Sequence, residues 1–87
     1  MARVVAAPTE LDAMTAPQFA SELRDGSSVV VDCRPVEFID SSGLKALLEA
    51  RQRVVGAGGQ VVLRNPPPVV LRLLAVTSTD GLFTIEA

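Results

Sequence analysis

The fold is decided by residues 29–44, which read VVVDCRPVEFIDSSGL. Residues 29–33 form an uninterrupted run of mostly β-branched side chains, which is typical of an interior strand rather than an edge strand. The segment Asp40-Ser41-Ser42-Gly43 then opens the longest helical pattern of the chain. The inner face of that helix is predicted to carry Leu44, Leu47, Leu48, Val54 and Val55. The stretch therefore predicts a buried strand that leads into a long amphipathic helix.

The same alternation of strand and helix continues on both sides of this unit. Strands are predicted for residues 3–7, 61–63 and 82–85, and further helices for residues 16–23 and 68–74. Thr15 is expected to cap the first helix, and the glycines of residues 56–59 to close the long one. The order βαβαβαβ predicts an α/β fold, a small, largely parallel four-stranded sheet with helices packed on one face. The predicted core consists of Phe19, Leu23, Val29, Val31, Leu44, Leu47, Leu48, Val62, Leu73 and Leu74.

Composition limits the chemistry that the chain can perform. Its 87 residues, 48% of them hydrophobic, suffice for one core, so residues 1–87 are read as a single domain. Eight basic and ten acidic residues give a net charge of −2, which argues against direct binding of nucleic acid. Histidine is absent, which excludes Ser-His-Asp and Cys-His nucleophiles and His-ligated zinc. The sequence thus favours a chain without metal or cofactor.

The compartment is indicated by two further features of the sequence. No apolar run approaches the length of about 18 residues that a membrane span needs, so no membrane segment is expected. The single Cys33 cannot form an internal disulfide, which fits a reducing, cytoplasmic environment.

The Asp40–Gly43 segment is the strongest candidate for a functional site, because sites in open α/β sheets gather at the carboxyl ends of strands. One interpretation is a plain helix cap, for which Asp40, Ser41 and Ser42 are all suitable residues. The other is a modifiable serine. A phosphoryl group on Ser41 would lie at the positive end of a helix, Ser42 would cap the helix, and Gly43 would give a partner access.

Other candidates for chemistry are weaker. Glu10 and Asp12 could form an acid–base pair, but a pair of loop carboxylates is equally expected to be solvated. Cys33 lies in a valine run and has no histidine to activate it, so it is predicted to be a small buried hydrophobe. Ser41 has no base beside it, and there is no nucleotide-binding loop. A hydrolase or phosphotransferase is therefore disfavoured.

The segment Phe38–Leu44 resembles the hallmark of STAS domains, specifically that of bacterial anti-sigma-factor antagonists. Glu10-Leu11-Asp12, followed by Thr15-Ala16, is similar to the loop Gly-Glu-Leu-Asp and the first helix of that family. Residues 80–85, which read DGLFTI, are similar to its closing strand. The resemblance covers nearly the whole chain from about Val4 onward.

This resemblance implies a minimal STAS fold that binds partners and catalyses nothing. In the family, an anti-sigma factor that is a serine kinase of the histidine-kinase-like ATPase class phosphorylates the first serine of the motif, here Ser41. A phosphatase of the PP2C type reverses the modification. The unmodified antagonist sequesters the anti-sigma factor and so frees a sigma factor for transcription, as in stress responses. The implied partner-binding residues are Asp12, Asp40, Ser42 and Gly43.

The sequence departs from the family pattern in three places. Thr9 stands where the family has glycine, and neither the first strand of an N-terminal hairpin nor a closing helix has a counterpart. Uncovered apolar surface is then expected, which favours a homodimer or a fold completed by a partner. The alternative function is a constitutive STAS interaction or scaffold subunit of a signalling assembly or of a lipid or anion transporter. The serine pair favours the phosphorylation-switched antagonist.

Overall fold

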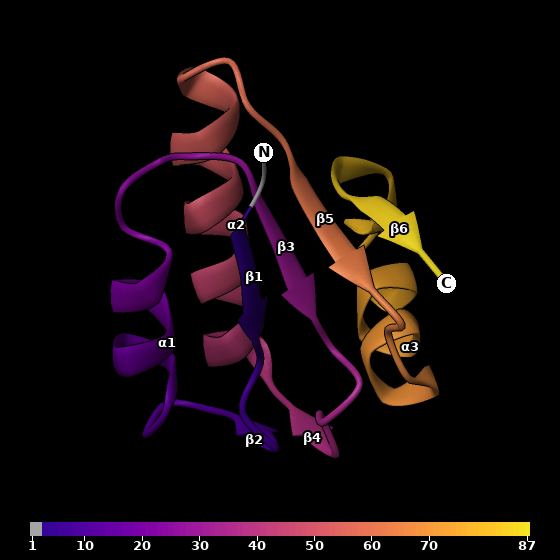
Figure 1. Cartoon of the computed structure of the whole chain (residues 1–87). Helices are drawn as coiled ribbons and strands as arrows, with labels where there is room; N and C mark the ends of the chain where they lie inside the picture. The colour runs from indigo at the N-terminus through magenta and orange to yellow at the C-terminus, as the bar shows by residue number, and fades with distance from the viewer. Residues whose placement is uncertain (1–2) are drawn as a thin grey trace.

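A four-stranded parallel sheet runs through the centre of the computed structural model, which describes residues 3–87. Its strands lie in the order β1 (Arg3–Ala6), β3 (Val29–Asp32), β5 (Val61–Arg64) and β6 (Thr84–Glu86), and all three neighbouring pairs are parallel. The helices α1 (Ala16–Glu22), α2 (Ser41–Gly56) and α3 (Pro68–Val76) alternate with these strands and lie on one side of the sheet (Figure 1). The predicted α/β fold and its βαβαβαβ order are confirmed.

Two very short strands were not predicted. β2 (Glu10–Leu11) and β4 (Phe38–Ile39) pair in parallel, with Leu11 opposite Ile39, and lie beyond the carboxyl ends of β1 and β3 (Figure 1). A 3₁₀ helix, η1 (Asp80–Leu82), also precedes the last strand, so that strand begins at Thr84 rather than at the predicted residue 82. Strands of two residues are too short to show any hydrophobic periodicity, which is why the pattern did not reveal β2 and β4.

The hydrophobic core lies between the sheet and the three helices. Its most deeply buried large side chains include Phe19, Leu23, Val29, Val31, Leu47 and Leu74, all of which were predicted, together with Leu11, Val54, Leu63 and Val70. Leu48 and Leu73 are only half-buried at the margin of the core, and Val55 is exposed. Val62 is buried but lies outside the core cluster, because alternate residues of a strand face opposite sides of the sheet. The predicted core thus differs from the structure at Leu48, Leu73 and Val62, and the placement of Val55 on the inner face of the long helix was wrong.

The long helix ends where its glycines allow the chain to turn. α2 ends at Gly56, and Gly58 adopts a φ of +87°, a left-handed conformation that glycine reaches without steric cost. The N–H of Gly59 then donates a 2.9 Å hydrogen bond back to the Val54 carbonyl. This arrangement satisfies a carbonyl that the end of the helix would leave unpaired, as the sequence predicted.

Candidate functional site

The Asp40–Gly43 segment lies at the start of α2, near the carboxyl ends of β1 and β3 (Figure 1). Asp40 has an extended backbone, and its carboxylate Oδ1 accepts hydrogen bonds from the N–H groups of Ser42 (2.9 Å) and Gly43 (3.2 Å). These two N–H groups belong to the first turn of the helix and have no acceptor within it, so Asp40 is its N-cap. The prediction that the Ser42 side chain caps the helix is wrong, because Asp40, the extended residue directly before the helix, places its carboxylate within reach of both N–H groups.

Ser41 is the exposed residue of this segment. It is the first residue of α2, whereas the neighbouring Ser42 is half-buried. Within residues 3–87 the Ser41 hydroxyl has no hydrogen-bond partner, so its removal would break no contact of the fold. An accessible, unengaged hydroxyl at the positive end of a helix can accept a bulky anionic group without displacing the backbone.

The Asp12 carboxylate is held by the turn that leads into α1. Its Oδ1 accepts hydrogen bonds from the N–H groups of Met14 (3.0 Å) and Thr15 (3.1 Å), and the side chain is half-buried. The Thr15 hydroxyl instead donates to the carbonyl of Glu10 at 2.6 Å. The prediction that the Thr15 side chain caps α1 is therefore wrong. Its hydroxyl stabilises the turn instead, and the Asp12 carboxylate accepts hydrogen bonds from the free N–H groups before the helix.

Gly43 holds the Asp12 turn against α2. A Cβ atom at Gly43 would collide with the Leu11 carbonyl oxygen and would lie 2.7 Å from Leu11 Cγ. The Asp40 N–H also donates to the Leu11 carbonyl at 3.3 Å. Because Gly43 is buried against Leu11, its backbone is not open to a partner, and the expectation of direct access is corrected. The absent side chain instead lets the turn and the Asp40–Gly43 segment approach closely.

Thr9 stands where the family has glycine, yet its backbone still joins the loop before β2 to the start of β4. Its carbonyl accepts hydrogen bonds from the N–H groups of Glu37 (2.7 Å) and Phe38 (3.3 Å). The turn around Asp12 and the segment around Ser41 are thus brought together by backbone hydrogen bonds. Each also carries an exposed apolar side chain, Met14 at 88% exposure and Phe38 at 47%.

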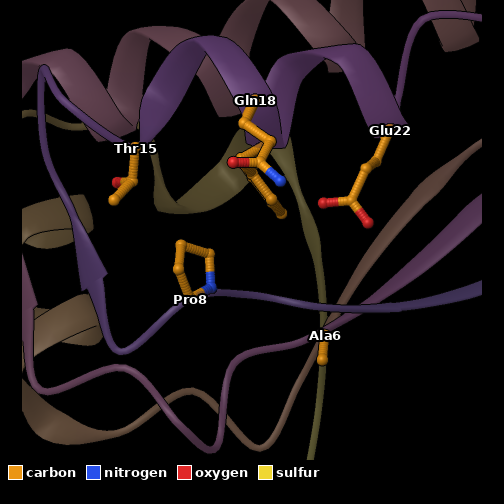
Figure 2. A pocket seen from close by; sticks show the side chains of 6 residues that line it. Ala6, Pro8, Thr15, Gln18 and Glu22 are labelled. Atoms are coloured by element: carbon orange, nitrogen blue, oxygen red, sulfur yellow. The ribbon is translucent and has the colours of Figure 1, made fainter.

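Two hollows open beside α1, and Ser42 is the one predicted site residue that lines either of them. The first, of about 180 Å³, lies between α1 and residues 6–8 (Figure 2). Thr15, Gln18 and Glu22 point toward it, and none of the predicted site residues lines it. The second, of about 280 Å³, lies between α1 and α2, with an apolar floor rich in alanine and with Ser42, Lys45 and Glu49 on the α2 side.

Sequence reasoning missed Lys45 at this site. Its position in the sequence could have revealed it, because Lys45 follows Ser41 by four residues. Residues four apart on a helix lie on the same face.

Cys33, the single cysteine of the chain, is buried. Burial, with a smaller contribution from the Asp32 carboxylate, raises the pKa of the Cys33 thiol to about 12, so the reactive thiolate is not formed near neutral pH. Residues 3–87 hold no group of three His, Cys, Asp or Glu side chains placed to bind a metal ion. No helix in the described part of the chain has the length and apolar character needed to cross a membrane.

Comparison with known proteins gives a family and a set of structural relatives. A family model described as "Mlab, STAS domain" matches residues 2–85. A STAS-domain containing protein of Pseudomonas aeruginosa is 39% identical over 57 residues, which are 66% of this chain. The chain spans only 56% of that relative's length.

Two solved proteins share the fold over 97% of this chain. A Thermotoga maritima protein described as a candidate anti-sigma factor antagonist superposes with a TM-score of 0.84 at 25% identity, over 79% of its own chain. The anti-sigma factor antagonist SpoIIAA superposes in its unphosphorylated form with a TM-score of 0.80 at 19% identity, over 78% of its chain. Its phosphorylated form, from Bacillus, gives 0.75 at 18% identity, over 81% of its chain. The family model matches nearly the whole of this chain, and anti-sigma-factor antagonists are among the structures that share its fold. This chain therefore belongs to the STAS domain family.

Proposed function

We propose that this chain is an anti-sigma-factor antagonist whose binding is switched by phosphorylation of Ser41. The observation that carries the proposal is the exposed Ser41 hydroxyl at the first residue of α2, which has no hydrogen-bond partner among residues 3–87. The helix does not need this hydroxyl as a cap, because the Asp40 carboxylate already accepts hydrogen bonds from the N–H groups of Ser42 and Gly43. A modification there can alter the surface without loosening the fold. The likeness to SpoIIAA, which is known in unphosphorylated and phosphorylated forms, supports the same assignment.

The proposed switch is electrostatic and steric. A phosphoryl group adds a charge of about −1.5 to −2 at neutral pH, beside the carboxylate of Asp40 and near the turn that holds Asp12. The positive end of α2 offsets part of this charge, so the fold should change little. A partner seated over a small neutral hydroxyl would instead meet a hydrated dianion among carboxylates. Its affinity should therefore fall.

The proposed partner surface combines the two segments that the backbone brings together. Asp12, Asp40 and Ser42 supply its polar part, and the exposed Met14 and Phe38 supply apolar area. Gly43, which was expected to contact the partner, contributes by keeping these segments in register. Apolar anchors surrounded by polar groups are typical of protein–protein interfaces.

In this proposal the partner is an anti-sigma factor that is also a serine kinase of the histidine-kinase-like ATPase class. The unmodified chain sequesters it in the cytoplasm and releases a sigma factor, and a phosphatase of the PP2C type restores the unmodified form. The chain itself performs no catalysis.

Phosphopeptide mapping tests the assignment of the acceptor. The chain is incubated with ATP and extract from its own cells, and intact mass and phosphopeptides are measured. We expect one added phosphoryl group, on Ser41, and none in the Ser41→Ala variant. Ser42→Ala is the matched control and should still be modified. A label that maps to Ser42, Thr15 or Thr9 would overturn the assignment.

The second candidate function is a constitutive interaction subunit of a signalling assembly or a transporter. It is compatible with the description of the matched family model, which names Mlab and a STAS domain but no antagonist. The two functions differ in one measurable property, because a constitutive subunit binds its partner equally well whether or not Ser41 carries a phosphoryl group.

A further inference from the structure

Lys45 is the single lysine of the chain and lies one helical turn after Ser41 on α2. Its side chain is exposed and lines the hollow between α1 and α2 together with Ser42 and Glu49. Within residues 3–87 the ion pairs are Arg3–Asp25 and Arg64–Glu86, so the Lys45 ammonium is not engaged in one. Among the described residues, a cation outside any ion pair thus lies one helical turn from the proposed phosphoacceptor.

Helix geometry directs this ammonium toward Ser41. Side chains of a helix lean toward its N-terminus, so a residue covers the turn that precedes it. The turn that precedes Lys45 contains Ser41 and Ser42, so a side chain with this lean can reach both. An acidic group four residues before a lysine is also the more favourable orientation of a helical ion pair. A phosphoryl group on Ser41 would take the acidic position of such a pair.

We propose that Lys45 is a positioning residue that binds the phosphoryl group of phosphorylated Ser41 and holds it against α2. This inference rests on the proposed modification of Ser41 and adds the residue that receives it. The ammonium and the phosphoryl oxygens form charge-assisted hydrogen bonds, which are stronger than neutral ones. Asp40 precedes Ser41 directly, and Asp12 follows Leu11, which packs against Gly43, so both carboxylates oppose a dianion here. Lys45 offsets them.

The pairing also changes the hollow between α1 and α2. In the unmodified chain Lys45 lies midway between Ser41 and Glu49, one helical turn from each. Once Ser41 is modified, the ammonium is drawn toward the phosphoryl group at one end of the hollow and away from Glu49 at the other end, although Lys45 and Glu49 do not form an ion pair in the unmodified chain. Phosphorylation of Ser41 would thus also change the distribution of charge along the hollow between α1 and α2.

The test measures the second pKa of the phosphoryl group by phosphorus NMR. Phosphoserine is inserted at position 41 during translation, so the experiment needs neither the kinase nor the partner. A nearby cation stabilises the dianion and lowers this pKa from its ordinary value of about 6. In Lys45→Gln we expect the pKa to rise by about 0.2–0.4, the shift typical of one exposed ion pair across a helical turn.

Three further variants separate a specific pair from a general effect of charge. Lys45→Arg keeps a cation at the same place and should restore the lower pKa. Arg53→Gln removes the same charge at the far end of α2, about 18 Å along the helix from Ser41, and should shift the pKa by less than about 0.1. Arg34 is a second cation at this edge of the sheet and lies in the turn after β3. A pKa that moves in Arg34→Gln but not in Lys45→Gln would overturn the proposal.

The outcome is independent of the proposed function. An unchanged pKa in Lys45→Gln would refute the ion pair even if phosphorylation of Ser41 controls partner binding. A raised pKa, restored by arginine, would establish the pair even if no kinase modifies Ser41. Unfolding midpoints of all four variants, measured beside the parent chain, exclude a loss of the fold as the cause of a shift.

Discussion

The contact between Gly43 and Leu11 predicts that replacing Gly43 by alanine damages the fold although alanine is the better helix former. In an unconstrained helix interior, this replacement stabilises by roughly 0.5–1 kcal/mol. At Gly43 the new methyl group would collide with the Leu11 carbonyl oxygen and lie 2.7 Å from Leu11 Cγ and 3.0 Å from the Leu11 carbonyl carbon. Carbon atoms prefer separations of about 3.5–4.0 Å, so the turn must move by up to about 1 Å.

That movement has a cost in free energy. Forcing an extra methyl group into a packed site typically costs about 1–3 kcal/mol. The displaced Leu11 carbonyl also loses the hydrogen bond from the Asp40 N–H, which is already long at 3.3 Å and is worth about 0.5–1.5 kcal/mol. After the gain in helix propensity is subtracted, Gly43→Ala should lose about 1–3 kcal/mol of unfolding free energy. In a domain of this size that lowers the melting temperature by about 4–8 °C per kcal/mol.

Gly56→Ala is the matched control, because Gly56 belongs to the same helix and a Cβ atom there meets nothing within 4 Å. It should be neutral or stabilise by up to about 1 kcal/mol. Urea unfolding of the parent chain and both variants gives the comparison directly. If Gly43→Ala proves as stable as Gly56→Ala, the Asp12 turn is not packed against α2, and the geometry described for the site is wrong.

Three further predictions concern the core, the cap and the cysteine. Leu47 is 1% exposed in the middle of the core, so Leu47→Ala should lower the unfolding free energy by about 2–5 kcal/mol in urea titrations, and a negligible loss would mean that α2 does not pack as described. Asp40→Ala should cost about 0.5–2 kcal/mol because it removes the cap, whereas Ser42→Ala should stay within about 0.5 kcal/mol; the reverse order would return the cap to Ser42. Burial raises the pKa of Cys33 from 9.0 to about 12, so the folded chain keeps a proton that the unfolded chain releases. The free energy of unfolding should therefore fall by up to about 1.4 kcal/mol per pH unit between about pH 9 and 12. In Cys33→Val the free energy of unfolding should fall less steeply with pH. Equal slopes in the two chains would contradict the burial of an un-ionised thiol.

The order of strands and helices could be predicted because each long element carries its own periodic signal. The valine run at residues 29–31 and the leucines of the long helix identify their elements without knowledge of their neighbours. The pattern could not tell which face of the central strands lies under the helices, since both faces of β5 are apolar. Val62 was therefore assigned to the core although it faces away from it.

The details of the site depended on the path of the chain, which composition does not reveal. Asp40, Ser42, Asp12 and Thr15 are all good capping residues, and only the backbone shows that the two aspartates reach the free N–H groups. The packing role of Gly43 likewise depends on the two-residue strands that bring Leu11 beside it. The Asp40–Gly43 segment could be located from the sequence, whereas the contacts that build it could not.

Titration calorimetry with the cognate anti-sigma factor tests the central proposal most directly. The unmodified chain and the chain phosphorylated at Ser41 are compared, with Ser41→Asp as a partial mimic. Couplings between a modification and binding typically run to about 5–150-fold in affinity. We expect the upper part of that range for phosphorylated Ser41, because the modified atom would lie inside the contact, and an intermediate loss for Ser41→Asp. Equal affinities for the unmodified and phosphorylated chains would contradict the switch and favour a constitutive interaction subunit.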